Sequence, residues 1–230
     1  MKLLVAVMTC HRLDYYIDDL TVDFNTPRRC LDQKQRVQTI RETWAQHLNG
    51  IDYKFFYGST LRNGGRVQRS PLPDEVFLPC GDNYTSNPQK MVEICKWARA
   101  HGYDYILRAD DDTFIYPERL LATNWREHDY SGSSEKDFHP GGCMFLSRRA
   151  MQLIISAKIT NWADDVWIGS VMQTNKIPMN HIESIHNEWG NGYKVDPEKV
   201  SPACSAYHSC VPEVMRVFEQ RRKQWTGPTM

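Results

Sequence analysis

The segment from residue 103 to residue 116 constrains the fold more than any other part of the chain. Its apolar run Tyr105–Leu107 is rich in strand-forming residue types. It leads to three consecutive acids, residues 110–112, and then to a second apolar run, Phe114–Ile115. Adjacent carboxylates repel one another unless a cation neutralises them, and oxygen ligands suit Mg²⁺ and Mn²⁺, which also bind diphosphates. The segment predicts a strand that ends at a metal site for a phosphate-bearing ligand; a solvated acidic turn is the alternative.

Apolar segments suited to buried strands alternate with amphipathic helical patterns along the chain. The expected strands are residues 3–8, 53–57, 75–78, 105–107 and 143–146. The expected helices are residues 35–48, 88–100, 118–122, 148–156, 164–173 and 211–224. This alternation indicates an α/β sheet, in which ligands bind beyond the carboxyl ends of the strands. The three acids follow such an end.

Three connecting segments lack a clear pattern. Residues 11–33 are expected to form a loop or a short helix, and residues 178–200 an irregular stretch. Residues 58–74 are expected to form a mobile basic loop that contains Arg62, Arg66 and Arg69.

Composition and cysteine spacing narrow the function classes. The 230 residues, 41% of them hydrophobic, suffice for one domain with a substantial core. Lys plus Arg equals Asp plus Glu at 28 each, so no strong overall field draws the chain to nucleic acid or to an anionic membrane. The seven cysteines form no Cys-x-x-Cys pair, which disfavours zinc and thioredoxin-type sites. Mostly free thiols are expected, with Cys80–Cys95 and Cys204–Cys210 as candidate disulfides in an oxidising compartment.

The apolar run at residues 1–8 is too short for a signal peptide and has no small-residue cleavage site after it. No stretch reaches the roughly 20 apolar residues that a membrane span needs. A full-length chain would then work in a cytosol.

Six short motifs follow one another along the chain. They are Arg36-x-x-x-Ile40-Arg41-x-Thr43-Trp44, Asp82-x-Tyr84 with Lys90, Asp110-Asp111-Asp112-x-Phe114, Pro140-x-Gly142 with Phe145-Leu146-Ser147, Asp164-Asp165-Val166-x-x-Gly169, and His208-Ser209. Together they resemble, in order, the motifs of the β-1,3-galactosyltransferase and Fringe family. The resemblance implies a GT-A type fold, with a mixed, mostly parallel central sheet flanked by helices, and metal-dependent, inverting transfer from a UDP-sugar. It also implies a nucleotide-binding half, residues 1–112, and an acceptor-binding and catalytic half, residues 113–230. Animal members usually carry a membrane anchor, so a trimmed chain would belong to the Golgi lumen.

The resemblance assigns a metal site to the acidic triplet. Asp112 would bind Mn²⁺, with Mg²⁺ as the alternative, and Asp110 would lie near the metal and the ribose. His208 matches the family's late histidine and would be the second protein ligand; His181 and His186 are competitors. The metal would screen the charge that grows on the departing UDP.

The resemblance also implies nucleotide-binding and donor-binding positions. These are Arg41, Asp82, Lys90, Asp110, Asp111 and Gly142. Arg41 and Lys90 carry positive charge suited to a diphosphate. Gly142 would let the backbone approach the donor sugar, and a simple tight turn is the competing explanation.

An inverting displacement needs a base that removes the proton from the acceptor hydroxyl. Asp165 is the expected base, and Asp164, which stands where the family usually has Glu, is the second catalytic candidate. An acidic helix N-terminus is the competing interpretation of the pair. Asn161, Trp162 and Trp167 could form part of an acceptor platform, and each tryptophan could equally belong to the core.

The sequence therefore predicts a UDP-sugar-dependent hexosyltransferase that acts on a hydroxyl of a glycan, glycoprotein or glycolipid. One alternative is a phage or viral enzyme that glycosylates a modified DNA base, with the arginines of residues 58–74 as a local basic patch. A non-catalytic nucleotide-sugar or glycan-binding module is an alternative of another class, and a metal-dependent nuclease or phosphatase is a third.

Overall fold

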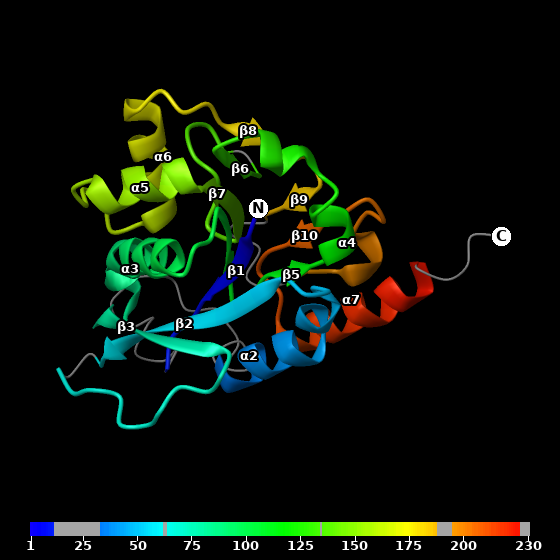
Figure 1. Cartoon of the computed structure of the whole chain (residues 1–230). Coiled ribbons are helices and arrows are strands. Elements are labelled where there is room, and N and C mark those ends of the chain that lie inside the picture. The colour runs from blue at the N-terminus through cyan, green and yellow to red at the C-terminus, as the bar shows by residue number, and fades with distance from the viewer. Residues whose placement is uncertain (12–32, 62–63, 134, 188–194, 226–230) are drawn as a thin grey trace.

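The computed structural model describes residues 1–11, 33–61, 64–133, 135–187 and 195–225. Its centre is a seven-stranded sheet in the order β3-β2-β1-β4-β7-β6-β8 (Figure 1). The strands are β1 (Leu3–Met8), β2 (Asp52–Thr60), β3 (Glu75–Gly81), β4 (Tyr105–Asp110), β6 (Tyr130–Gly132), β7 (Cys143–Ser147) and β8 (Asn180–His181). β7 runs antiparallel to β4 and to β6, and the other neighbours are parallel. The expected α/β class with a mixed, mostly parallel sheet is confirmed.

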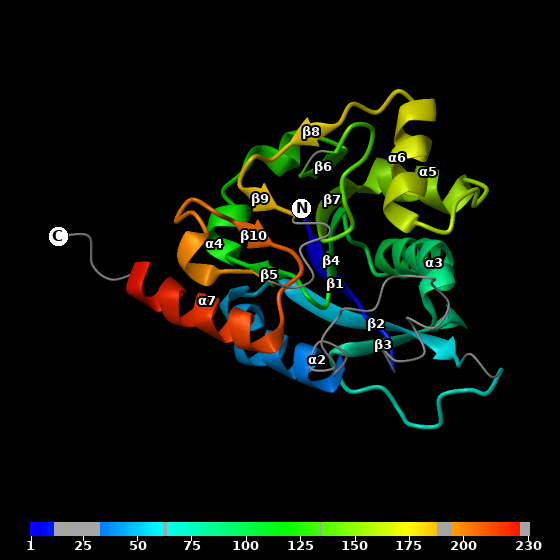
Figure 2. The same cartoon turned by 180° about the vertical axis from the view of Figure 1, so that it is seen from behind.

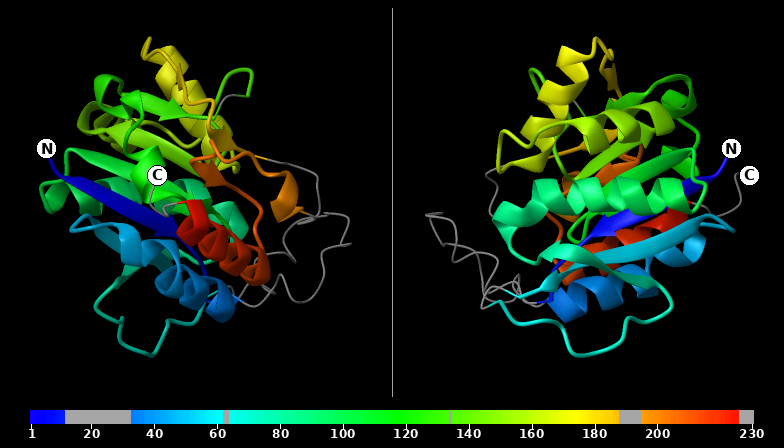
Figure 3. Two further views of the ribbon diagram at one scale, coloured as in Figure 1. Left: turned by 90° about the vertical axis from the view of Figure 1, so that its right-hand side faces the viewer. Right: turned by 60° about the vertical axis from the view of Figure 1, so that its left-hand side comes forward.

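Helices cover both faces of this sheet. They are α2 (Gln33–Glu42), α3 (Asn87–Ala100), α4 (Pro117–Leu120), α5 (Arg148–Ser156), α6 (Asp164–Thr174) and α7 (Pro212–Trp225). Short 3-10 helices occupy η2 (Trp44–His47), η3 (Tyr84–Ser86), η4 (Asn124–Glu127) and η5 (Pro197–Lys199). Figure 3 shows α2 and α7, blue and red, on one face, and the green helices α3 and α5 on the other. α2 lies against α7, as Figure 2 also shows.

Two hydrophobic cores result, one on each face. Side chains of a strand alternate between faces, and β1 sends Val5 and Val7 into the core under α2 and α7. Leu4 and Ala6 enter the core under α3, α5 and α6. All six residues of β1 are buried, as expected for a strand covered on both sides.

A second, three-stranded sheet lies beside the carboxyl end of β4. Its strands are β5 (Phe114–Ile115), β10 (Ala206–Tyr207) and β9 (Ile185–His186), with β10 in the middle. β10 pairs antiparallel to β5 and parallel to β9. This pairing brings a segment close to the C-terminus next to the acidic triplet.

Several expected elements differ in extent. The helix expected over residues 35–48 ends at Glu42, because Thr43 leaves helical geometry at φ −117° and ψ −114°, and the 3-10 helix η2 follows. The expected loop at residues 58–74 begins later, since β2 continues to Thr60. The stretch at residues 178–200 contains β8, β9 and η5 rather than only irregular chain. Residues 12–32 of the first connecting segment, and Arg62, lie outside the described residues.

The cysteines of the described chain are free thiols, and all six of them are buried. Neither Cys80–Cys95 nor Cys204–Cys210 forms a disulfide. Across the described residues, no helix has the length and apolar character that crossing a membrane requires.

Candidate functional site

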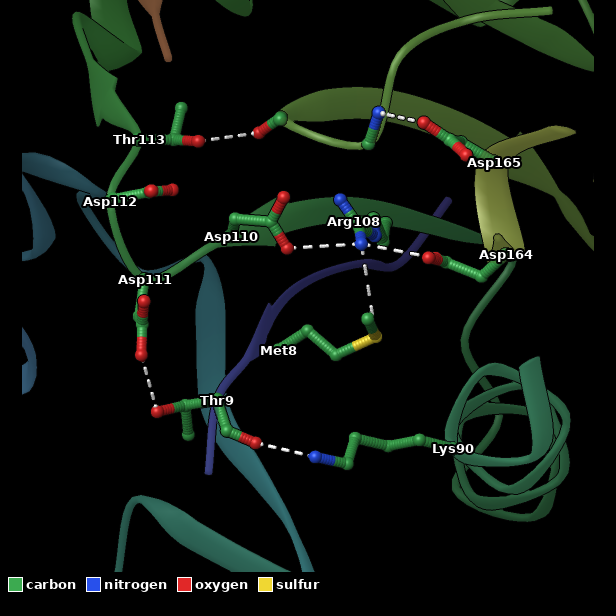
Figure 4. A network of polar contacts seen from close by, with 12 residues as sticks. Met8, Thr9, Lys90, Arg108, Asp110, Asp111, Asp112, Thr113, Asp164 and Asp165 are labelled. Atoms are coloured by element: carbon green, nitrogen blue, oxygen red, sulfur yellow. Dashed lines mark hydrogen bonds and ion pairs between the residues drawn. The ribbon is translucent and has the colours of Figure 1, made fainter. Parts of the chain in front are cut away.

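The acidic triplet lies where β4 ends, beside the end of β1 and the start of β7. Asp110 pairs in register with Met8, the last residue of β1. The chain turns directly after Asp110, with the Thr113 amide donating to the Asp110 carbonyl at 3.1 Å. Thr113 Oγ1 donates to the Gly142 carbonyl at 2.7 Å and fixes the turn to the loop before β7 (Figure 4). The triplet therefore occupies the carboxyl edge of the sheet, where α/β proteins bind ligands.

Asp110, Asp112 and His208 form a group that could hold a metal ion. One ligand atom from each lies within 4.8 Å of the others. His208 Nε2 is 3.1 Å from Asp112 Oδ1 and 3.6 Å from Asp110 Oδ2. Asn187 Oδ1, 2.6 Å from Nδ1, orients the ring so that Nε2 faces the acids. His186 is not in this group: its ring stacks on Tyr207.

The protein environment shifts the protonation of this group. Burial raises the pKa of Asp110 to about 7, although 26% of its side chain is exposed, and Arg108 opposes the shift. Burial lowers the pKa of His208, but Asp112 and Asp110 outweigh burial, so its pKa is raised above the ordinary value. Both shifts favour the protonated forms, so a bound cation would compete with protons at these two side chains.

Arg108 joins the triplet to α6, and the sequence analysis did not identify it. This β4 side chain is 1% exposed, and its Nη2 lies 3.0 Å from both Asp110 Oδ1 and Asp164 Oδ2 (Figure 4). Gly141 makes room for the guanidinium, because a Cβ there would lie 2.6 Å from Nη1. The available signal was an arginine inside an otherwise apolar strand, two residues before the acids, because a buried charge needs a partner.

Asp164 and Asp165, the two acids that begin α6, are both buried. Asp165 Oδ2 accepts from the Gly141 amide at 3.1 Å, and its Oδ1 accepts from the Val166 amide at 2.8 Å. Burial raises the pKa of Asp164, while its ion pair with Arg108 opposes the shift. The N-terminus of α6 stabilises negative charge on the pair. Asp164 and Asp165 thus face the triplet across Arg108.

Asp111 points away from the metal-binding group. Thr9 Oγ1 donates to its Oδ2 at 2.7 Å, and Arg36 Nη1 lies 3.0 Å from its Oδ1. The same Arg36 nitrogen is 3.4 Å from Asp112 Oδ2. Asp111 therefore ties β1 and α2 to the triplet, and its expected contact with the nucleotide stays a prediction.

Lys90 and Asp82 form a buried pair near the end of β1. Lys90 Nζ donates to the Thr9 carbonyl at 2.6 Å and to Asp82 Oδ1 at 3.1 Å. Asp82 also accepts from the amides of Gly58 and His11, at 2.7 and 2.5 Å. Thr9 joins this pair to the triplet, because its carbonyl accepts from Lys90 and its hydroxyl donates to Asp111.

Arg41, by contrast, forms ion pairs with Asp74 and Glu75 at the start of β3, at 2.7 and 3.2 Å. Its expected contact with the nucleotide stays a prediction. Gly142 makes a close approach possible, as expected, but the approaching group is the imidazole of His208: a Cβ at Gly142 would lie 2.5 Å from its Cγ. Of the two tryptophans near α6, Trp167 is a core residue, 1% exposed, and Trp162 is 51% exposed.

Comparison with known proteins adds a family match. Residues 34–136 match the family described as Galactosyltransferase. This range runs from α2 to the segment after β6 and includes the triplet, but it ends before α6 and His208. No curated protein matches the chain.

Solved structures resemble the chain in fold at low identity. A nucleotide-diphospho-sugar transferase, as it is described, from Desulfovibrio desulfuricans G20 is 11% identical, with TM-score 0.48, over 98% of this chain and 99% of its own. A glycosyltransferase involved in the glycosylation of the major capsid of PBCV-1 is 14% identical, with TM-score 0.47, over 94% and 100%. The catalytic domain of Drosophila β1,4-galactosyltransferase 7 is 11% identical, with TM-score 0.39, over 81% and 67%.

Proposed function

We propose that this chain, a glycosyltransferase related to the galactosyltransferases through residues 34–136, transfers a hexose or N-acetylhexosamine from a UDP-sugar to an acceptor hydroxyl with inversion. One observation carries the proposal: Arg108 links a group that could hold a metal to the acids at the start of α6, with 3.0 Å contacts to Asp110 and Asp164. The metal-binding group would then bind the donor diphosphate, and the acids of α6 next to it would accept the proton of the acceptor hydroxyl. The acceptor belongs to a glycan, glycoprotein or glycolipid.

The residues present fit a Mn²⁺ or Mg²⁺ ion. Asp110 and Asp112 offer carboxylate oxygens and His208 offers Nε2, a donor set that suits Mn²⁺ in particular. When bound, the ion would neutralise charge on the UDP leaving group. Lys90 and Arg36 add positive charge next to the triplet, and both are held in place by buried contacts.

Asp165 is the proposed base. Each of its oxygens accepts one backbone hydrogen bond, and a carboxylate oxygen has a second lone pair available for the acceptor hydroxyl. The two amides hold the carboxylate in one orientation. Asp164 is proposed as a positioning residue, because its ion pair with Arg108 holds the start of α6 against β4.

A calorimetric titration of UDP, first with Mn²⁺ and then with excess chelator, tests the donor site. We expect metal-dependent binding in the wild type and its loss in Asp112→Asn. Asp165→Asn should bind UDP normally but reduce sugar transfer by a hundred-fold or more, the usual range for removing a general base. The anomeric configuration of the product, read by NMR, tests inversion.

Three results would contradict the proposal. Absence of UDP binding with Mn²⁺ would remove the donor assignment and favour a phosphatase or nuclease. Near-normal turnover in Asp165→Asn would remove the assignment of the base. Metal-dependent UDP binding without transfer to any acceptor would instead indicate a non-catalytic module.

A further inference from the structure

An open hollow with an apolar wall lies at the approach to α6. Its volume is about 540 Å³, and it is lined by Thr85, Ile159, Thr160, Asn161 and Trp162. Large hydrophobic side chains are rarely exposed in the described chain, yet two of the four that are exposed line this hollow: Trp162 at 51% and Ile159 at 37%. Their concentration at one place indicates a binding surface rather than scattered exposure.

The segment that carries this wall is held in place. The Trp167 indole, inside the core, donates to the Lys158 carbonyl at 3.0 Å and fixes the segment to α6. The Ala163 amide donates to Asn161 Oδ1 at 3.0 Å, which shapes the turn directly before Asp164. Trp162 is thus presented by a chain with its own hydrogen bonds, two residues before the first acid of α6.

Tyr84 adds a second aromatic ring beside the hollow. Its ring lies against Trp162, with the ring centroids 5.5 Å apart and the planes tilted by 49°. Burial raises the pKa of the Tyr84 hydroxyl, and Asp110, Asp164 and Asp165 raise it further. The Tyr84 ring is part of the aromatic surface around Trp162. The segment that carries this surface leads directly into α6, with Trp162 two residues before Asp164 and three before Asp165.

The chemistry of the lining fits a saccharide. A pyranose has a face of C–H groups that packs on an aromatic ring, and hydroxyls around its edge that need polar partners. Trp162 and Ile159 offer the apolar surface, and Thr85, Thr160 and Asn161 offer hydroxyl and amide groups. No lining residue is charged. A nucleic-acid acceptor would require cations for its phosphates, so the neutral lining favours a sugar.

We propose that Trp162, with Tyr84 and Ile159, is the platform that binds a saccharide acceptor by its apolar face and directs one hydroxyl toward Asp165. This inference rests on the proposed transferase function and adds to it the residues that bind the acceptor sugar. The acceptor sugar covers the indole, and its hydroxyls reach Thr85, Thr160 and Asn161. The platform binds the acceptor and takes no part in binding UDP.

Saturation-transfer NMR on the full chain, with UDP and Mn²⁺ present, tests the platform. The probes are the methyl β-glycosides of galactose, glucose, xylose and N-acetylglucosamine, together with a single-stranded oligonucleotide. We expect at least one glycoside to bind the wild type and to bind at least ten-fold more weakly to Trp162→Ala. Trp162→Phe, which keeps an aromatic face, should fall in between.

Controls separate this surface from the donor site and from the fold. Leu72→Ala is the matched variant, because Leu72 is 50% exposed but lies outside the hollow, and it should bind the glycosides as the wild type does. UDP affinity measured by calorimetry should be equal in the wild type and all three variants. With an active donor, Trp162→Ala should raise the acceptor KM at least ten-fold, whereas Leu72→Ala should leave it unchanged.

Each contrary outcome has its own meaning. If UDP binds normally but no glycoside binds, or if Trp162→Ala does not weaken glycoside binding, the platform is wrong and the proposed function stands. If the oligonucleotide binds in a way that depends on Trp162 and no glycoside binds, the acceptor is a nucleic acid and the saccharide assignment is wrong. If the wild type does not bind UDP with Mn²⁺, the proposed function fails, and the platform fails with it.

Discussion

Arg108 is the residue on which the arrangement of acids depends most. Its guanidinium is buried and forms ion pairs with both Asp110 and Asp164. Without it, the negative charges of these two carboxylates would have no cation beside them in a poorly hydrated region. Burying a charge without a partner costs far more than a surface ion pair contributes. The acids can therefore be close enough to act together only because this cation lies between them.

Replacing Arg108 with Met should destabilise the protein by about 3–5 kcal/mol, because the buried Asp164 and the partly buried Asp110 lose their partner. Urea unfolding measures the effect. Arg149→Met is the matched control, since Arg149 pairs with Asp129 at the surface with 67% of its side chain exposed, and it should cost less than about 1 kcal/mol. Adding Asp164→Asn to the Arg108→Met variant should recover part of the loss. Equal effects of the two arginine replacements would show that Arg108 has no such role.

Among single residues, the acids could be predicted from the sequence, but their partners could not. The triplet, the pair at the start of α6 and His208 are recognisable from residue type and order. Arg108 is not, because no spacing rule joins a strand residue to an acid 56 positions later. Asp111 lies in the turn after β4, and its carboxylate is directed to Thr9 and Arg36, contacts that the order of the acids does not reveal.

Among the elements, long periodic segments were predictable and very short ones were not. The helix at residues 148–156 and the strand Leu3–Met8 agree with the expected bounds. β5, β9 and β10 have two residues each, too few to show a period of two. These short strands nevertheless place His208, since β10 pairs with β5 directly after the triplet. The order of motifs could suggest His208 as a ligand, but only the pairing shows how it reaches the acids.

The loop before β7 is predicted to control this placement through Gly142. In Gly142→Ala, the new Cβ would lie 2.5 Å from His208 Cγ, so the imidazole or the loop must move. We expect Mn²⁺ affinity, measured by calorimetry, to fall at least ten-fold. Gly64→Ala is a suitable control, because a Cβ there meets nothing within 4 Å and only its φ of +77° is strained. That variant should lose a little stability and keep its Mn²⁺ affinity; unchanged affinity in Gly142→Ala would refute the argument.

For the whole molecule, the metal-binding group joins two distant parts of the chain. Asp110 is the last residue of β4 in the central sheet, Asp112 lies in the turn after it, and His208 follows β10 in the small sheet. Even without an ion, the Cys210 amide donates to the Asp112 carbonyl at 2.8 Å and holds the two sheets together. An ion bound by all three side chains would have no equivalent site in the unfolded chain. Metal binding should therefore stabilise the entire fold.

The stabilisation by Mn²⁺ should depend on pH with a defined sign. The pKa of Asp110 is about 7 in the metal-free fold and about 4 in an unfolded chain, so between these values the fold binds more protons than the unfolded chain. Asp110 therefore makes the metal-free protein more stable as pH falls from 7 toward 4, and Mn²⁺ must compete with this proton. At pH 8, Mn²⁺ at 100 times its Kd should raise the free energy of unfolding by about 2.7 kcal/mol. The same concentration should give clearly less at pH 5.5.

Urea unfolding with Mn²⁺ and with chelator, at both pH values, measures this difference. The comparison with and without metal is needed because other buried groups also titrate. Burial lowers the pKa of His139 to about 4. His139 therefore makes the fold less stable as pH falls from about 6.5 to 4, which is opposite to the effect of Asp110. That contribution is present with and without metal, and it cancels. Asp112→Asn should show no stabilisation by Mn²⁺ at either pH. Equal stabilisation of the wild type at pH 8 and pH 5.5 would mean that the ion does not displace the proton of Asp110, and the metal would then have to bind elsewhere.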